Sequence, residues 1–121
     1  MFQKVAFTMY PVKDSTRARA FYEETLGLKR GSASPNGTWT EYDLPGGGCL
    51  ALFQTNDIQP SAGAGGSVAF EVEDLDALRD RLAAAGVEFK AKEVQSPVCR
   101  MSIIVDSEGN SIILHQLHKK H

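Results

Sequence analysis

The 121-residue sequence has few of the residues from which common functional sites are built. It contains two cysteines, Cys49 and Cys99, and three histidines that all lie near the end of the chain. Two cysteines do not make a disulfide framework, so we expect a reducing compartment, the cytoplasm. No apolar run approaches the roughly 18 residues that a membrane-spanning helix needs, and no signal-peptide core is expected at the start of the chain.

The charge and composition narrow the class of protein further. The formal net charge is −2 and no basic stripe stands out, which argues against a nucleic-acid partner. Hydrophobic residues make up 42% of the chain and charged residues 23%, a balance that argues for a packed core and against disorder. This length fits one domain, which buries about two-thirds of its unfolded surface.

The chain repeats one pattern twice. In each half, an apolar strand (5–10 and 68–72) precedes an Asp that is a good helix N-cap, Asp14 and Asp74. An apolar helical face and a closing glycine follow each Asp at nearly the same interval. We expect Pro11 to end the first strand, because proline has no N–H to donate.

Three more strands are expected in each half. Asp106 and Gly109 fit the first and fourth positions of a type I turn between two apolar runs, which predicts an antiparallel hairpin. The remaining predicted strands start at Leu28, cover 39–44 and 49–54, and start at Val87. The sequence thus predicts a single domain of two βαβββ modules, 1–56 and 67–121, joined by the glycine-rich linker 57–66. Because one helix covers only one sheet face, we expect an α+β fold. In it, the modules form a mixed eight-stranded half-barrel sheet around a cavity, with the helices outside.

Two groups of residues resemble a known superfamily. They are Asp14…Phe21-Tyr22…Leu26-Gly27-Leu28 and Asp106-Ser107-Glu108-Gly109-Asn110…Ile113-Leu114-His115. In this order they resemble the vicinal oxygen chelate superfamily, the group of glyoxalases, bleomycin-resistance proteins and extradiol dioxygenases. The resemblance implies the fold just described and leaves the reaction open, since this fold supports many chemistries.

The resemblance also implies where a metal site would lie. In metal-dependent members, His or Glu ligands come from the first and last strands of each half. Carried over by position, these four places are Phe7, Leu52, Ser67 and Ile113. None is a usual metal ligand, so the resemblance implies a cavity that holds no metal and no other cofactor.

Residues two positions further along a strand share its face and are expected to line the same cavity. His115 and Glu71 are the candidates for catalysis, because an imidazole exchanges protons near neutral pH and a carboxylate inside an apolar strand needs a partner. That partner is His115 or Arg100, and Arg100 is also a candidate anion anchor. The alternative is that these are ordinary solvated residues. The predicted ligand-binding set is Phe7, Met9, Leu52, Gln54, Ser67, Glu71, Arg100, Ile113 and His115.

Four further side chains, two aromatic rings and two thiols, could lie near the cavity or in the core. Trp39 and Tyr42 lie on opposite faces of one predicted strand, and the sequence does not say which faces the cavity. Cys49 is expected to be a small core residue. Cys99 and Arg100 are neighbours in a strand, so at most one of them faces the cavity.

These observations favour a metal-free protein that binds a small, partly apolar molecule. One alternative is a metal-dependent lyase, isomerase or dioxygenase with shifted ligands, which would have to include His115 with Glu71 or Glu41. A second alternative is a dimeric interaction module with a vestigial cavity. By analogy with small members of the superfamily, we expect a homodimer.

Overall fold

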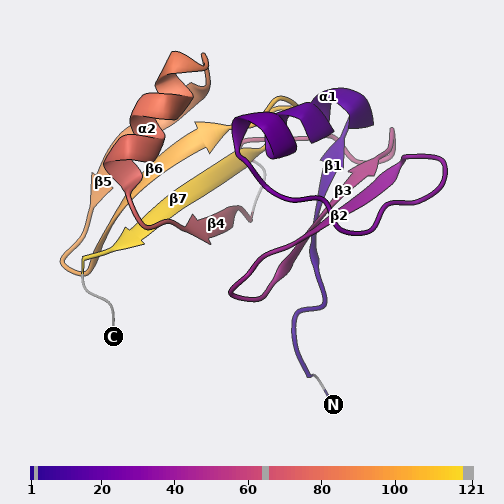
Figure 1. The fold of residues 1–121 in the computed structure, drawn as a ribbon, viewed down its shortest axis with the longest axis horizontal. Helices are drawn as coiled ribbons and strands as arrows, with labels where there is room; N and C mark the ends of the chain where they lie inside the picture. Colours follow the sequence, from indigo (N-terminus) through magenta and orange to yellow (C-terminus); the bar gives the residue numbers. More distant parts are fainter. Residues whose placement is uncertain (2, 64–65, 119–121) are drawn as a thin grey trace. The chain divides into compact units, whose positions relative to one another are not determined.

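The computed structural model describes residue 1, residues 3–63 and residues 66–118. It divides the chain into two compact units, Met1–Pro60 (unit 1) and Ser61–His121 (unit 2), each with a helix and a sheet of its own (Figure 1). Within the described ranges, no helix is long and apolar enough to cross a membrane. The boundary between the units falls inside the predicted linker 57–66.

Unit 1 has a three-stranded sheet in the order β1-β3-β2. Strand β1 (Thr8–Val12) pairs parallel with β3 (Cys49–Gln54), and β3 pairs antiparallel with β2 (Trp39–Asp43). Helix α1 (Ser15–Ala20) connects β1 to the hairpin and continues into a π-helical turn, η1 (Phe21–Thr25).

Unit 2 has a four-stranded sheet in the order β4-β7-β6-β5, with α2 packed on one face of it (Figure 1). Its elements are β4 (Val68–Glu71), α2 (Leu75–Ala84), β5 (Glu88–Gln95), β6 (Cys99–Val105) and β7 (Ser111–Leu117). Strand β4 pairs parallel with β7, and the other pairs are antiparallel.

The predicted helix signals are present in both units. Asp14 Oδ1 accepts a hydrogen bond from Arg17 N at 3.1 Å, and Asp74 Oδ1 accepts one from Ala77 N at 3.1 Å. These contacts satisfy N–H groups that a helix start leaves without partners. Tyr22 and Leu82 are fully buried, which confirms that the helices pack their apolar faces on the sheets.

The hairpin between β6 and β7 is held by the Asp106 carboxylate, as the turn sequence predicts. Asp106 Oδ1 accepts hydrogen bonds from Glu108 N and Asn110 N, each at 2.8 Å. Gly109 N donates to Asp106 O at 3.3 Å, which closes the turn, and Gly109 has a positive φ of 98° that suits a residue without a Cβ.

The first unit departs from the prediction in two places. The strand expected from Leu28 is absent from the described residues, which contain seven strands rather than eight. Residues 31–34 run beside β2 and form only one isolated bridge, Ala33 to Thr40, because this Gly- and Ser-containing stretch has low strand propensity. Pro11 does not end β1 but pairs with Phe53, which is tolerated because β1 is an edge strand of its sheet.

Candidate functional site

Each sheet has one face covered by its helix and one face that we call helix-free. In unit 2, Arg100 and Gln116 contact α2, so the residues that alternate with them along β6 and β7 lie on the helix-free face. Burial agrees with this alternation, because Ser102, Ile104, Ile112 and Leu114 on the helix-covered face are almost fully buried.

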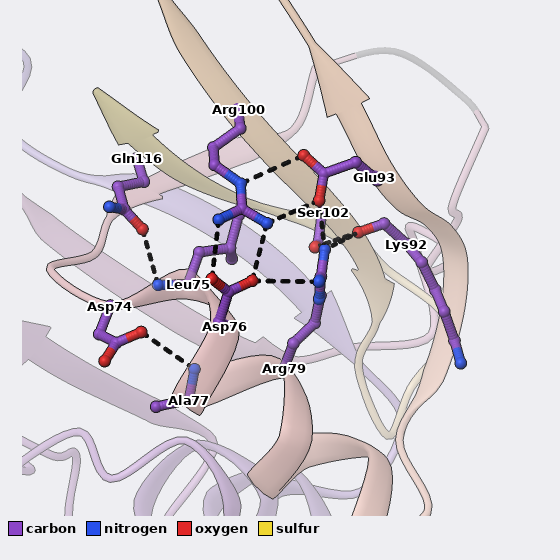
Figure 2. A network of polar contacts seen from close by, with 10 residues as sticks. All are labelled: Asp74, Leu75, Asp76, Ala77, Arg79, Lys92, Glu93, Arg100, Ser102 and Gln116. Atoms are coloured by element: carbon purple, nitrogen blue, oxygen red, sulfur yellow. Dashed lines mark hydrogen bonds and ion pairs between the residues drawn. The ribbon is translucent and has the colours of Figure 1, made fainter. Parts of the chain in front are cut away.

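A pair of glutamines marks the helix-covered face in both units. Gln54 Oε1 accepts a hydrogen bond from Ser15 N, the first residue of α1, at 2.7 Å. Gln116 Oε1 accepts one from Leu75 N, the first residue of α2, at 2.7 Å (Figure 2). Each amide therefore ties the end of the last strand of its unit to the start of its helix.

This contact corrects the predicted orientation of β3. Gln54 and Leu52 were expected to share a face with Phe7, but Gln54 reaches α1 and Leu52 is 2% exposed beside it. Both side chains therefore lie on the helix-covered face. The predicted alternation along β3 was wrong by one residue. Ala51 and Phe53 occupy the helix-free face of β3 instead.

The ladder registers identify the corrected position. In unit 2, Ile113 lies opposite Ala69, which is two residues after Ser67. In unit 1, the residue opposite Met9, two residues after Phe7, is Ala51. Ala51 is therefore the first-half counterpart of Ile113.

The corrected positions do not suit a metal ion. Phe7, Ala51 and Ile113 have no donor atom, and the Ser67 hydroxyl shares a short hydrogen bond with Ser111 Oγ. Across the part of the chain that the structure describes, no group of three or more His, Cys, Asp or Glu residues could hold a metal ion. The residues at these four positions thus do not fit the metal of the metal-dependent members.

The helix-free face of unit 1 carries a group of three aromatic rings, Phe7, Trp39 and Phe53. The Phe7 and Trp39 centroids are 5.2 Å apart with an interplanar angle of 88°, and those of Trp39 and Phe53 are 5.7 Å apart. Phe7 is 46% exposed, and the other two are partly exposed. Trp39 therefore faces away from the helix, whereas Tyr42 is buried on the covered side and donates to Glu23 Oε2 at 2.9 Å.

Two polar groups lie beside these rings. Glu41 Oε2 accepts a hydrogen bond from Trp39 Nε1 at 2.7 Å, which fixes the indole in place. Cys49 Sγ lies 3.8 Å from Glu41 Oε1. Burial, followed by the negative charges of Glu41 and Asp43, raises the pKa of the Cys49 thiol, so Cys49 is protonated and a poor nucleophile at neutral pH.

The helix-free face of unit 2 brings Glu71 and His115 together. Glu71 Oε1 lies 2.5 Å from His115 Nδ1, and Glu71 Oε2 accepts a hydrogen bond from Leu117 N at 3.1 Å. The predicted partner of Glu71 is thus His115 rather than Arg100. The cross-strand neighbours on this face are apolar, with Met101 opposite His115 and Ile103 opposite Ile113.

Arg100 lies on the other face, where it fastens α2 to the sheet. Its guanidinium donates to Asp76 Oδ1 at 2.8 Å, to Asp76 Oδ2 at 3.0 Å and to Glu93 Oε1 at 2.8 Å (Figure 2). Arg79 also pairs with Glu93 and Asp76. Arg100, followed by Arg79, lowers the pKa of Glu93 to about 2. Carboxylates of this chain already hold Arg100, which corrects its expected role as an anion anchor on the cavity side.

Comparison with known proteins places the chain in a family. The sequence model of the Glyoxalase/Bleomycin resistance protein/Dioxygenase superfamily matches residues 4–114, and the chain belongs to this superfamily. No curated protein matches the chain.

Solved structures show the same fold. An antibiotic-binding protein, TnmS3, from Streptomyces sp. CB03234 is 27% identical, with a TM-score of 0.80 over 96% of this chain and 97% of that one. A glyoxalase/bleomycin resistance protein from the same Streptomyces strain is also 27% identical, with a TM-score of 0.75 over 91% and 97% of the two chains. A lactoylglutathione lyase from Agrobacterium tumefaciens is 23% identical, with a TM-score of 0.72 over 93% and 92% of the chains, and shows similarity of fold alone.

Proposed function

We propose that this protein binds a small, partly apolar molecule on the helix-free faces of its sheets, without a metal ion. The observation that carries the proposal is the partly exposed aromatic group of Phe7, Trp39 and Phe53. Three adjoining rings that keep part of their surface exposed favour a ligand or partner that covers them. Two rings nearly at right angles form a corner that a flat apolar molecule contacts on two sides.

The chemistry at the four ligand-equivalent positions supports a binding role. Three of them are apolar, and they adjoin a few polar groups, Glu41, Glu71 and His115. An apolar surface with a small number of polar anchors is typical of sites for small organic molecules. The 27% identity to an antibiotic-binding protein points in the same direction.

Binding of a naphthalene probe tests this proposal. Trp39 is the only tryptophan, so titration of chelator-treated protein with 2-methoxynaphthalene should change its fluorescence. Burying one aromatic side chain contributes about 1.5–3 kcal/mol. Phe53→Ala should therefore weaken binding by about ten- to 150-fold. Added Zn²⁺, Ni²⁺ or Mn²⁺ should leave the affinity unchanged.

A matched control is Phe89→Ala. Phe89 is a partly buried phenylalanine opposite Ile104, on the helix-covered face of unit 2. This variant should bind the probe like the wild type. Equal losses in Phe53→Ala and Phe89→Ala, or binding that appears only with added metal, would contradict the proposal.

A homodimer in the cytoplasm is part of the same proposal. Cys49 and Cys99 are free thiols, which suits a reducing compartment. Small members of the superfamily are expected to pair as symmetric dimers. Light scattering of the purified protein should give twice the chain mass, and a monomer mass would remove this part of the proposal.

A further inference from the structure

On the helix-free face of unit 2, the Glu71 carboxylate makes two contacts at once. One oxygen lies 2.5 Å from His115 Nδ1, and the other accepts from Leu117 N at 3.1 Å. The side chain of Glu71 is 54% exposed and that of His115 is 27% exposed, so this pair is open to a ligand.

These contacts determine which ring nitrogen of His115 carries the proton. An ionised carboxylate can only accept hydrogen bonds, so Nδ1 must be the donor in this short contact. In the neutral imidazole, Nε2 then has a lone pair and no proton. Nε2 makes no hydrogen bond to any residue among 1, 3–63 and 66–118, and its cross-strand neighbour Met101 is apolar.

We propose that Glu71 is a positioning residue that keeps His115 Nε2 an acceptor, so that the protein selects ligands with a hydroxyl donor, such as a phenol or an enol. This inference rests on the proposed binding of small, partly apolar molecules to the helix-free faces, here that of unit 2, and adds the polar group that a ligand carries there. A ligand O–H that donates to Nε2 replaces a water contact with a directed hydrogen bond next to the apolar residue Met101. An ether or ketone at the same place leaves Nε2 without a partner, which costs binding free energy.

The hydrogen bond from Leu117 N to Glu71 predicts how the Glu71→Gln variant should change the protonation of His115. In Glu71→Gln, the new side-chain carbonyl must face Leu117 N, because that N–H needs an acceptor. The new NH₂ group then faces Nδ1 and donates to it, which moves the imidazole proton to Nε2. Glu71→Gln should therefore turn Nε2 from an acceptor into a donor with almost no change in side-chain size. Glu73→Gln, at an exposed position, is the control for loss of one negative charge.

The experiment has two readouts, both taken at about pH 8. The first is long-range ¹H–¹⁵N NMR of the ligand-free protein, with His115→Phe used to assign the His115 signal. The wild type and Glu73→Gln should show an unprotonated Nε2, and Glu71→Gln an unprotonated Nδ1. A proton on Nε2 in the wild type would overturn the inference whether or not any ligand binds.

The second readout compares 2-naphthol with 2-methoxynaphthalene by calorimetry. The wild type and Glu73→Gln should prefer the naphthol by about five-fold or more, the worth of one hydrogen bond. His115→Phe should lose the preference, and Glu71→Gln should lose or reverse it. Equal binding of both probes to the wild type would overturn hydroxyl selection and leave the proposed function standing. Failure of both probes to bind would count against the proposed function itself and against hydroxyl selection with it.

Discussion

Unit 1 and unit 2 begin their helices with the same contacts. Asp14 and Asp74 cap α1 and α2 at 3.1 Å, and Gln54 and Gln116 accept from the first helical residue at 2.7 Å. Gly27 and Gly86, which follow the helices, have φ values of 82° and 81°. The repeated pattern in the sequence is thus a repeated set of backbone hydrogen bonds and turns.

The helix-free faces of the two units differ. Unit 1 carries aromatic rings with the carboxylate of Glu41, and unit 2 carries aliphatic residues with the Glu71–His115 pair. Both units use the same kinds of residues to hold the helix on the sheet, but they carry different kinds of residues on the opposite face. The residues that hold the scaffold together and those proposed to bind a ligand thus occupy separate faces of the same strands.

The largest expected effect concerns the helix-covered faces. Leu52 and Leu114 are each 2% exposed and hold equivalent places, opposite Tyr10 and Phe70. Leu52→Ala and Leu114→Ala should each lower the free energy of unfolding by about 2–5 kcal/mol, because both leave a cavity in a packed core. Urea denaturation followed by circular dichroism measures this.

The control for this pair is Ile113→Ala, on the helix-free face, which should cost less than either leucine. If Leu52→Ala left stability unchanged and instead weakened probe binding, the assignment of Leu52 to the helix-covered face would be wrong.

A smaller effect is expected at the two glutamines. Gln54→Ala and Gln116→Ala each remove the acceptor of one helix N–H, which should cost about 0.5–2 kcal/mol in each unit. The exposed Gln59→Ala should be close to neutral. Chemical denaturation of the three variants gives the comparison. Similar losses support two equivalent helix anchors, and a loss at one glutamine alone would break the equivalence.

The smallest effect concerns the acid range, through the ion pairs that hold α2 on the sheet of unit 2. Arg100 lowers the pKa of Asp76, and Arg100 and Arg79 lower that of Glu93 to about 2 from its ordinary value of 4.5. A lowered carboxyl pKa contributes stability above its ordinary value, and this contribution is lost as the pH falls from 4.5 towards 2. Thermal unfolding of Glu93→Gln should therefore depend less on pH across this range than that of the wild type. If the unfolding temperatures of the variant and the wild type changed equally with pH, the ion pairs of Glu93 would contribute no stability.

Features governed by local sequence could be predicted. Asp14 and Asp74 sit before apolar helical faces, and Asp106 and Gly109 suit one type of turn, so caps and hairpin were confirmed. For Glu71, the sequence predicted the need for a partner and named His115 or Arg100, but it did not decide between them, because the contact spans 44 positions.

Features that depend on register or on distant partners could not be predicted. A shift of one residue exchanges the two faces of a strand, and nothing in the apolar run 50–53 fixes that register without its neighbours. The role of Gln116 depends on a helix start 41 positions away, and Arg100 depends on carboxylates of α2 and β5. The tolerance of Pro11 in β1 could not be predicted either. It depends on β1 being an edge strand, which is a property of the whole sheet.

A methyl NMR titration of the protein with 2-naphthol tests directly whether the ligand binds on a helix-free face. Ala51 and Leu52 are neighbours in β3, and Ile113 and Leu114 are neighbours in β7, with one residue of each pair on each face. If the ligand binds on a helix-free face, the methyl signals of that face should shift, Ala51 in unit 1 or Ile113 and Met101 in unit 2, while those of Leu52 and Leu114 stay nearly unchanged. Shifts centred on Leu52 and Leu114, or no shifts at a saturating concentration of the probe, would contradict the account.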